Sequence, residues 1–220
     1  MLTSMTRLLA GYRVASVGPR PAQPLELYEF ESCPFCRKVR EAASVLDLEL
    51  LVKPCPKRGQ RFRPHVVEVG GREQFPYLVD PNTGTSLFES DDIVRYLFDH
   101  YGEGPIPGLL RPALSTPTSV LAGLWRLASG TFVRPSKCPA EPLELYSFEA
   151  SPYCRIVREA LCVLELPYRL HNVGKGSAGR AALEARAGKV MVPYLVDPNT
   201  GVEMFESAEI VAYLERTYAA

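Results

Sequence analysis

The hydrophobic positions of this chain alternate between strand-like and helix-like spacing. Leu25, Leu27 and the aromatic residues beside them predict a short strand. Apolar residues then recur at the i, i+3, i+4 and i+7 positions of one helix face, at Val39, Ala42, Ala43 and Leu46. A second strand is expected over residues 48–52, and it runs parallel to the first if the helix crosses between them.

The next part of the chain predicts a second helix and a hairpin. A polar, basic stretch carries the helix, which ends at Gly70-Gly71. Two strands, 77–79 and 86–88, are separated by Asp-Pro-Asn-Thr-Gly at 80–84, a turn sequence that makes an antiparallel hairpin. A last helix ends before Gly102, so the predicted order of elements is βαβαββα.

The same pattern occurs a second time with nearly the same residues. Residues 24–30 and 142–148 both read Pro-Leu-Glu-Leu-Tyr-X-Phe. Residues 76–84 and 193–201 both read Pro-Tyr-Leu-Val-Asp-Pro-Asn-Thr-Gly. A period this long excludes a solenoid of short repeats. Each copy alone forms only a marginal core, so we expect it to gain stability by docking on the other.

The chain divides into a lead-in segment (1–23), a first domain (24–104), a linker with a short helix (105–141) and a second domain (142–220). Residues 1–25 carry arginines and no acid, as organelle transit peptides do. The sequence Leu-Ala-Gly at 9–11 recurs at 121–123, however, inside another stretch without acids. A targeting signal has no reason to recur mid-chain. We therefore interpret both stretches as short basic helical lead-ins of the repeat unit, with a transit peptide as the alternative.

Composition and charge limit the partners and the compartment. The chain has 25 basic and 25 acidic residues, and zero net charge gives no general reason to expect nucleic acid or a membrane as partner. Membrane association through the lead-in helices is a weaker alternative. No apolar run reaches the roughly 18 residues that span a bilayer. Six irregularly spaced cysteines favour a reducing compartment, the cytoplasm or an organelle such as a plastid.

The candidate chemistry lies where the first helix of each copy begins. The first copy has Cys33-Pro34-Phe35-Cys36 there, and a proline in the first turn costs no hydrogen bond. The free N–H groups and the positive dipole end of the helix lower the pKa of a thiol from about 8.5 into a range of roughly 3.5 to 7.5. Arg37 adds a cation nearby. Cys33 is therefore the predicted attacking thiolate, and Cys36 the resolving thiol.

Other uses of two cysteines at this spacing stay open. They could be half of a zinc site, although no second pair or histidine cluster has ligand spacing. They could also hold a metal cluster shared across a dimer, or be a structural pair of buried thiols. The second copy has Ser151 and Cys154 in the same places. Because the pKa of a serine hydroxyl is far too high for disulfide exchange, this copy has lost the reactive pair.

Several of these motifs occur in one order that resembles a known family. A strand, Cys-Pro-Phe-Cys-Arg at a helix start, an apolar-Pro-Tyr-Leu strand and Glu-Ser opening the last helix are similar to the glutaredoxins and to the N-terminal domains of glutathione transferases. The resemblance implies an α/β protein of two tandem thioredoxin-fold (βαβαββα) domains, and the acid-free stretches add a short basic helical lead-in before each. We do not expect the all-helical second domain of the transferases, since the second copy ends at Ala220.

The resemblance also implies where glutathione binds. Phe75-Pro76 and Val192-Pro193 are expected to be cis, and the backbone of the residue before each proline would pair with the cysteinyl part of glutathione. Each Glu-Ser pair would receive the γ-glutamyl end at a helix start, where Ser90 is also expected to be the N-cap. The predicted glutathione-binding residues are Arg37, Phe75, Pro76, Glu89, Ser90, Ser151, Cys154, Arg155, Val192, Pro193, Glu206 and Ser207.

The two predicted glutathione sites differ in charge. Asp91 and Asp92 add negative charge in the first copy, so we expect glutathione to bind the second at least as well. The first copy also has a basic run from Lys53 to Arg63. This run is either a solvated surface or a clamp for the glycyl carboxylate of glutathione or for an acidic protein substrate. Ser151 is similar to the serine of serine-type glutathione transferases, whose hydroxyl donates a hydrogen bond to the thiolate of glutathione. The alternative is that the second copy has lost its activity and is retained only for packing.

These features together predict a glutathione-dependent thiol–disulfide oxidoreductase. The first copy would reduce glutathione mixed disulfides or protein disulfides with glutathione as co-substrate and without a metal. The second copy would bind glutathione or serve as a scaffold. The expected partners are glutathione and a disulfide-bearing protein or small molecule. The alternatives are an enzyme of the glutathione transferase or dehydroascorbate reductase type, and a non-enzymatic assembly module.

Overall fold

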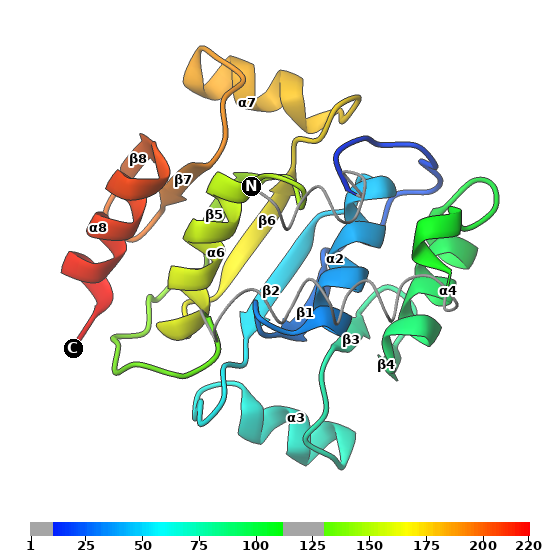
Figure 1. Ribbon diagram of the computed structural model, residues 1–220, viewed down its shortest axis with the longest axis horizontal. Helices are drawn as coiled ribbons and strands as arrows, with labels where there is room; N and C mark the ends of the chain where they lie inside the picture. Colours follow the sequence, from blue (N-terminus) through cyan, green and yellow to red (C-terminus); the bar gives the residue numbers. More distant parts are fainter. Residues whose placement is uncertain (1–10, 112–129) are drawn as a thin grey trace.

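The computed structural model describes residues 11–111 and 130–220, and both copies share one eight-stranded sheet (Figure 1). The first copy contains β1 (Leu25–Glu29), α2 (Pro34–Val45), β2 (Leu50–Pro54), α3 (Arg63–Gly70), β3 (Tyr77–Asp80), β4 (Thr85–Phe88) and α4 (Ser90–Tyr101), followed by the 3-10 turn η1 (Gly108–Leu110). The second contains β5 (Leu143–Ser147), α6 (Pro152–Val163), β6 (Tyr168–Asn172), α7 (Gly179–Ala187), β7 (Tyr194–Asp197), β8 (Val202–Phe205) and α8 (Ser207–Tyr218). The strand order is β4-β3-β1-β2-β6-β5-β7-β8.

The predicted order of elements is confirmed in both copies. β1 pairs in parallel with β2, as expected for strands joined by the crossover helix α2. β3 pairs antiparallel with β1 and with β4, so the predicted hairpin is also confirmed. The second copy repeats all three pairings. The residues predicted to form the apolar face of α2 are all buried, namely Val39, Ala42, Ala43 and Leu46.

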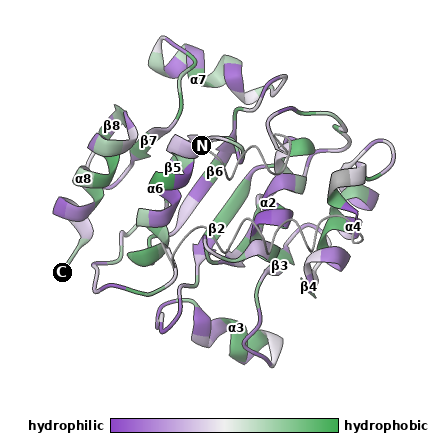
Figure 2. Cartoon of the chain, viewed as in Figure 1, coloured by the Kyte–Doolittle hydropathy of each residue, from purple (hydrophilic) through white to green (hydrophobic). Residues whose placement is uncertain are grey.

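Helices α2, α4, α6 and α8 cover the same face of the sheet (Figure 1). Side chains along a strand point alternately to the two faces. Leu27 and Leu78 belong to the large core under these helices, which extends through both copies. Tyr28 and Tyr77 point the other way and pack with Val66 of α3 in a separate small cluster. β2, in the middle of the sheet, is largely hydrophobic (Figure 2).

The two copies join edge to edge. β2 pairs antiparallel with β6, with Leu50 opposite Leu170 and Val52 opposite Tyr168. Because β1 is parallel to β2 and β5 is parallel to β6, β1 and β5 run in opposite directions. The copies are therefore related by an approximate twofold axis between β2 and β6. The carboxyl ends of β1 and β5 lie at opposite edges of the sheet (Figure 1).

A network of buried charges connects α2 with α6. The guanidinium of Arg40 pairs with Glu29, with Glu31 at 3.0 Å and with Glu149 at 2.9 Å. Arg158, the equivalent residue of α6, pairs with Glu31 and Glu149, each at 3.1 Å. Both arginines are 1% exposed. Each guanidinium thus contacts carboxylates of both copies, and removing one partner would leave an unpaired charge inside the protein.

The network is not symmetric. Its third carboxylate, Glu29, has Ser147 as its equivalent in the second copy, and the Ser147 hydroxyl lies 3.3 Å from Arg158. Burial raises the pKa of Glu29 to about 7, although Arg40 acts to lower it. For Glu149, burial also acts to raise the pKa, but Arg158 and Arg40 outweigh it and the pKa is lowered. Of Glu29 and Glu149, Glu29 is therefore the carboxyl group that remains protonated as the pH approaches 7.

Equivalent loop contacts flank the network on each side. The carboxylate of Asp47, after α2, accepts hydrogen bonds from Asn172 Nδ2 at 2.7 Å and from the Ala178 N–H at 3.1 Å. The carboxylate of Glu165, after α6, accepts from the N–H groups of residues 60–61 at 3.3 and 3.2 Å. Each copy thus uses the end of its first long helix to hold a loop of the other copy.

The described parts of the two lead-in segments also make equivalent contacts. The backbone of Lys175 in the second copy pairs with residues 12–14 at 2.8 and 3.0 Å. The backbone of Lys57 in the first copy pairs with residues 131–133 at 2.6 and 3.1 Å. The predicted lead-in helices fall largely in residues 1–10 and 112–129, outside the described residues. Within the described ranges, no helix is both long and apolar enough to cross a bilayer.

The repeated Asp-Pro-Asn-Thr-Gly turn has a structural role. Asp80 is fully buried and accepts hydrogen bonds from the hydroxyls of Tyr96, at 2.7 Å, and Tyr101 of α4. Asp197 accepts two equivalent bonds from tyrosines of α8, both at 2.6 Å. The aspartate of each copy therefore ties the hairpin to the last helix.

Replacing Glu29 by Gln should change how stability depends on pH. The folded-state pKa of about 7 lies above the ordinary value of 4.5, so the folded protein binds this proton more tightly than the unfolded chain does. This carboxyl therefore lowers the stability as the pH rises from 4.5 to about 7. The full loss corresponds to roughly 3 kcal/mol. Urea denaturation should show that the free energy of unfolding of E29Q falls less between pH 5 and pH 8 than that of the unchanged protein.

The exposed Glu68 provides the control for this experiment, because its replacement by Gln should leave the pH dependence as it is. If E29Q and the unchanged protein lose the same free energy between the two pH values, Glu29 does not carry the buried proton.

Candidate functional site

The first candidate site is the turn between β1 and α2. Cys33 is the N-cap residue of α2, with extended backbone angles (φ −74°, ψ 121°), and Pro34 is the first helical residue. The Cys33 Sγ accepts a hydrogen bond from the Cys36 N–H at 3.3 Å. Cys33 is 4% exposed and Cys36 is fully buried. The dithiol thus stands at a helix N-terminus, as the sequence predicted.

The two thiols differ in acidity. The pKa of Cys33 is lowered, chiefly by a hydrogen bond from the Cys36 side chain. Hydrogen bonds from the backbone N–H groups of residues 35–36 lower it further, and together they outweigh burial, which acts to raise it. Burial raises the pKa of Cys36 well above its ordinary value. Cys33 therefore ionises first, and the Cys36 thiol donates a hydrogen bond to its thiolate.

Arg37, a predicted glutathione-binding residue, lies in the interface between the two copies. Its Nε lies 3.0 Å from Glu41 of the same helix and 3.9 Å from Glu149 of the second copy, and its side chain is 7% exposed. Its charge is paired inside the interface because this side of α2 packs toward the second copy. That Arg37 binds glutathione stays a prediction, and its charge is already used by these two carboxylates. Arg155, its equivalent, lies 3.2 Å from Glu159 of its own helix.

Both predicted cis prolines are confirmed, at Phe75-Pro76 and Val192-Pro193. The Phe75 ring lies edge-on to Phe30, with 6.2 Å between ring centres. Arg63 lies over the same ring, with its Cζ 4.6 Å from the centre. Since Phe30 is three positions before Cys33, the cis turn of the first copy lies beside the dithiol turn.

The Glu-Ser pair of the first copy takes a different capping arrangement from the one predicted. Glu89, with φ 65°, is the N-cap of α4, and Ser90 is the first helical residue. The prediction that Ser90 is the N-cap is wrong, because the chain turns one residue earlier through a left-handed conformation. The exposed Glu89 carboxylate accepts a hydrogen bond from Gln74 Nε2 at 2.5 Å. Glu206 has the same backbone conformation, with φ 71°.

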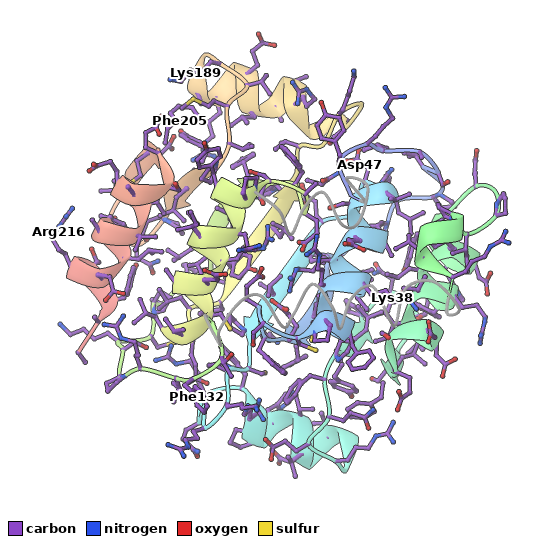
Figure 3. All side chains as sticks on the ribbon, in the orientation of Figure 1. Lys38, Asp47, Phe132, Lys189, Phe205 and Arg216 are labelled. Carbon is purple, nitrogen blue, oxygen red and sulfur yellow. The ribbon has the colours of Figure 1, made fainter. Side chains whose placement is uncertain are left out.

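The negative charge expected beside the first site is compensated by cations. Asp91 forms an ion pair with Lys38 of α2, whose side chain is only 2% exposed. Figure 3 shows Lys38 on the side of α2 that faces α4. Asp92 pairs with Arg95 at 3.1 Å. Neither acid therefore acts as an isolated charge at the start of α4.

The second candidate site has the same turn with an oxygen in place of the first sulfur. Ser151 is the N-cap of α6, and its Oγ accepts a hydrogen bond from the Cys154 N–H at 3.3 Å. Cys154 is fully buried, so its thiol is shielded from solvent. Beside this turn is a cavity of about 290 Å³, lined by Tyr153, Met191, Val192, Pro193, Glu206 and Ser207.

The cavity brings together four predicted residues from the loop before β7 and the start of α8. Its volume is close to the lower end of the range for ligand pockets, about 300 to 1,000 Å³. Ser151, Cys154 and Arg155 are not among the residues that line it. Tyr153 and Met191 line it and were not predicted. The sequence indicated a role for Tyr153 only by its position inside the four-residue turn at 151–154, and nothing in it pointed to Met191.

The two candidate sites do not face each other. Cys33 follows the carboxyl end of β1 and Ser151 follows that of β5, and these strands run in opposite directions. In Figure 1 the first site lies at the edge of the sheet near α3 and the second at the edge near α7. A thiol held in the second copy therefore cannot reach Cys33 of the same chain.

Metal-ligating side chains do not gather in the part of the chain that the structure describes. No group of three or more His, Cys, Asp or Glu residues there is arranged to hold a metal ion. All six cysteines are free thiols. Cys162 is 2% exposed and accepts a hydrogen bond from the Glu31 N–H at 3.4 Å.

The chain matches a known protein family twice. The family is described as glutathione S-transferase, N-terminal domain, and its model matches residues 27–105 and again residues 145–220. Each match runs from the first strand of one copy to the region of its last helix. Together the two matches cover more than half of the chain.

Individual relatives match only part of the chain. Over 84 residues, 38% of this chain and 37% of the relative, it is 33% identical to glutathione S-transferase D7 of Drosophila melanogaster. The solved glutathione transferase BmGSTD1 of Bombyx mori shares 32% identity over 39% of each chain, with a TM-score of 0.34. Glutaredoxin 2 of Salmonella typhimurium, solved in complex with glutathione, shares 26% identity over 39% of each chain, with a TM-score of 0.29. The chain thus spans well under half the length of these relatives.

Replacing Cys36 by Ala should raise the pKa of Cys33, because the variant removes the thiol that donates to the thiolate. The direction follows because a hydrogen bond to a charged group favours the charged form, here the thiolate. The pKa would be read from the pH dependence of iodoacetamide alkylation, in a background in which the exposed Cys138 is replaced by Ser. Cys154→Ala is the matched control in the second copy and should not move this titration. An unmoved Cys33 titration in C36A would contradict the assigned cause.

Proposed function

The chain belongs to the glutathione S-transferase N-terminal domain family, in two copies, and from this premise we propose that its first copy is a glutathione-dependent thiol–disulfide oxidoreductase. The observation that carries the proposal is the dithiol at the start of α2, in which the Cys33 thiol is acidified and the Cys36 thiol is buried. The thiolate is the form of cysteine that attacks a disulfide, and the N-terminal end of a helix favours this form.

The proposed reaction is an exchange of disulfide bonds. The Cys33 thiolate attacks one sulfur of a glutathione mixed disulfide, a new S–S bond forms as the old one breaks, and the other sulfur leaves as a thiolate that takes a proton from solvent. When Cys33 retains the glutathione, the thiolate of a second glutathione attacks this adduct. The products are glutathione disulfide and a regenerated Cys33 thiolate, so sulfur and electrons balance.

A protein disulfide as substrate would use the second thiol. Cys33 attacks the disulfide, and Cys36, deprotonated, then attacks the mixed disulfide at Cys33 and releases the reduced protein. Two glutathione molecules in turn reduce the Cys33–Cys36 disulfide and leave as glutathione disulfide. The raised pKa of Cys36 keeps it protonated in the resting site, which favours a step that begins at Cys33.

We propose that glutathione lies along the cis turn in each copy. In the first copy its cysteinyl backbone would pair with the main chain of Phe75, and its γ-glutamyl carboxylate would point to the N–H groups at the start of α4. In the second copy Val192 and the start of α8 would take these roles. The second cavity supports this arrangement because Val192, Glu206 and Ser207 all line it. The name of the Drosophila relative supports glutathione as the ligand.

A transferase-type reaction in the second copy is the second candidate, and one contact favours it. The Ser151 Oγ accepts the N–H of Cys154, so its own proton is available to a glutathione thiolate. That thiolate would attack a small electrophile or reduce a substrate such as dehydroascorbate. A protein that catalyses neither reaction would be the non-enzymatic module.

We propose a reducing compartment for this chemistry, the cytoplasm or an organelle such as a plastid. The reaction consumes reduced glutathione, and both Cys33 and Cys36 must return to the thiol state after each turnover. The proposed partners are glutathione and a disulfide-bearing substrate.

Replacing Cys33 by Ser should abolish turnover, since a serine hydroxyl cannot attack a disulfide at neutral pH. Activity would be followed as reduction of the mixed disulfide of glutathione and 2-mercaptoethanol, coupled to glutathione reductase. The matched variant Cys154→Ser, which changes the buried thiol of the second copy, should keep the activity within about twofold. Equal losses in both variants would overturn the division of labour between the copies.

Filling the second cavity should separate glutathione binding by the two copies. Met191→Trp should weaken binding of S-methylglutathione at the second site by about tenfold or more, because the larger side chain occupies space that the ligand needs. Calorimetry would compare it with Gln74→Trp, the equivalent change in the first copy, and turnover at Cys33 would be measured in both. A variant M191W that binds two equivalents with unchanged affinity would remove glutathione from the second cavity.

A further inference from the structure

A basic and aromatic surface is built from both copies at the first site. It consists of Lys57 and Arg58, in the loop after β2, and Phe132, in the second lead-in; we refer to it as the Lys57–Arg58–Phe132 surface. All three side chains are exposed, and the Phe132 ring is 48% exposed. The Lys57 Nζ lies 6.0 Å and the Arg58 Cζ 5.7 Å from the centre of the ring.

This surface lies next to the dithiol turn. The Thr131 hydroxyl donates a hydrogen bond to the Ser32 hydroxyl at 2.7 Å, and Ser32 directly precedes Cys33. The Lys57 N–H bonds to the Thr131 carbonyl at 2.6 Å. Figure 3 shows Phe132 at the edge of the molecule near the loop that leads to α3. A molecule bound to this surface would therefore extend toward Cys33.

The other cations of the basic run already have partners within the chain. Lys53 pairs with Glu26 at 2.6 Å. Arg61 donates to the carbonyls of residues 164–165 at 3.2 and 2.5 Å, and Arg63 pairs with Glu73. Lys57 and Arg58, in contrast, form no ion pair with any carboxylate in residues 11–111 and 130–220. Their charges are therefore available to an outside partner.

A hollow adjoins the surface at Arg58 and is lined by residues of both copies. It has a volume of about 280 Å³ and is lined by Arg58, Gln60, Arg61, Val133, Arg134, Pro135, Ser136 and Glu165. Arg134 is paired with Glu215 at 2.6 Å, and Glu165 is used by the loop at residues 60–61. The hollow thus offers Arg58 as its unpaired charge and gives room for an extended segment.

The second copy lacks an equivalent of this surface. The equivalent backbone pairings place Lys175 at the position of Lys57 and Arg13 at that of Phe132, and Gly176 then stands for Arg58. A role in holding the two copies together would be needed on both sides of the twofold axis. Lys175 and Arg13 also give that side two cations, but no aromatic ring stands at the position of Phe132. An exposed ring contacted by two cations is therefore found, among the described residues, only at the copy that has the dithiol, which associates it with the substrate of that copy.

We propose that the Lys57–Arg58–Phe132 surface docks an acidic segment of a protein substrate beside the disulfide that Cys33 attacks. The inference rests on the proposed function, because it names the substrate class of that same site. Carboxylates of the segment would pair with Lys57 and Arg58, and an apolar side chain would cover Phe132. Exposed ion pairs contribute little each, so the surface selects among substrates without being needed for small disulfides.

Two short synthetic peptides test the proposal with the full chain. Each has one cysteine as its mixed disulfide with glutathione, followed by either Asp-Glu-Phe-Glu or Asn-Gln-Phe-Gln. The kcat/KM for the acidic peptide should exceed that for the neutral one by about three- to tenfold at low salt, and the ratio should fall toward one at high salt. The double variant K57Q/R58Q should lose the ratio. The matched variant K175Q should keep it.

Each outcome separates the surface from the chemistry. Equal rates with both peptides, or a ratio that survives in K57Q/R58Q, would overturn the docking surface and leave the oxidoreductase in place. A higher KM for glutathione in K57Q/R58Q with an intact peptide ratio would assign the cations to glutathione and overturn the proposal. Stronger competition by an oligonucleotide than by the acidic peptide would assign the surface to nucleic acid and overturn it as well.

A chain that reduces neither peptide would refute the proposed function, and binding would then decide the surface. Fluorescence anisotropy with the acidic peptide, its cysteine replaced by serine, should show binding to the unchanged chain that is lost in K57Q/R58Q. Absence of binding to the unchanged chain would overturn the docking surface in that case too. Phe132→Ala should weaken the binding less than loss of both cations, while the salt dependence remains.

Discussion

The structure depends on the contact between the two copies, where β2 pairs with β6 and a network of buried ion pairs connects α2 with α6; we call this contact the seam. Arg40 and Arg158 each contact carboxylates of both copies, so neither arginine keeps its full set of partners if the copies separate. Buried ion pairs of this kind contribute modestly to net stability but strongly disfavour arrangements that leave them unpaired. We infer that the network fixes how the copies dock, while the shared apolar core supplies most of the driving force.

This seam also determines where the chemistry is. Because β2 pairs antiparallel with β6, the carboxyl ends of β1 and β5 point in opposite directions, and the two sites are separate. Each site borders the lead-in segment that precedes the other copy in the sequence. The first site is thereby completed by residues 131–133 from beyond the first domain. A single isolated copy would have the dithiol turn but not this border. The tandem arrangement therefore contributes to the first site even though the second copy has Ser151 in place of Cys33.

Differences between the copies concentrate around the first dithiol. Ser151 takes the place of Cys33 in the second copy, and Ser147 takes the place of Glu29. The charge of Glu29 acts against ionisation of both Cys33 and Cys36, and burial holds the pKa of Glu29 near 7. The copy with the dithiol thus also has the additional carboxyl group of the buried network. The second copy, with a serine and a cavity, is better suited to holding a ligand than to exchanging disulfides.

The sequence by itself determined the elements that depend on near neighbours. Alternating apolar spacing predicted βαβαββα twice, the four-residue turn placed Cys33 at a helix start, and the resemblance located both cis prolines. The tertiary structure decided everything that joins residues far apart. Arg37 and Arg40 pair inside the interface because the turn between β5 and α6, more than a hundred positions away, supplies Glu149. The charge of Asp91 is compensated because Lys38 of α2 forms an ion pair with it. Lys57 contacts Phe132 only because the second copy packs against the first. Periodicity reports which face of a helix is covered, but the identity of the partner that covers it is set by how the two copies pack.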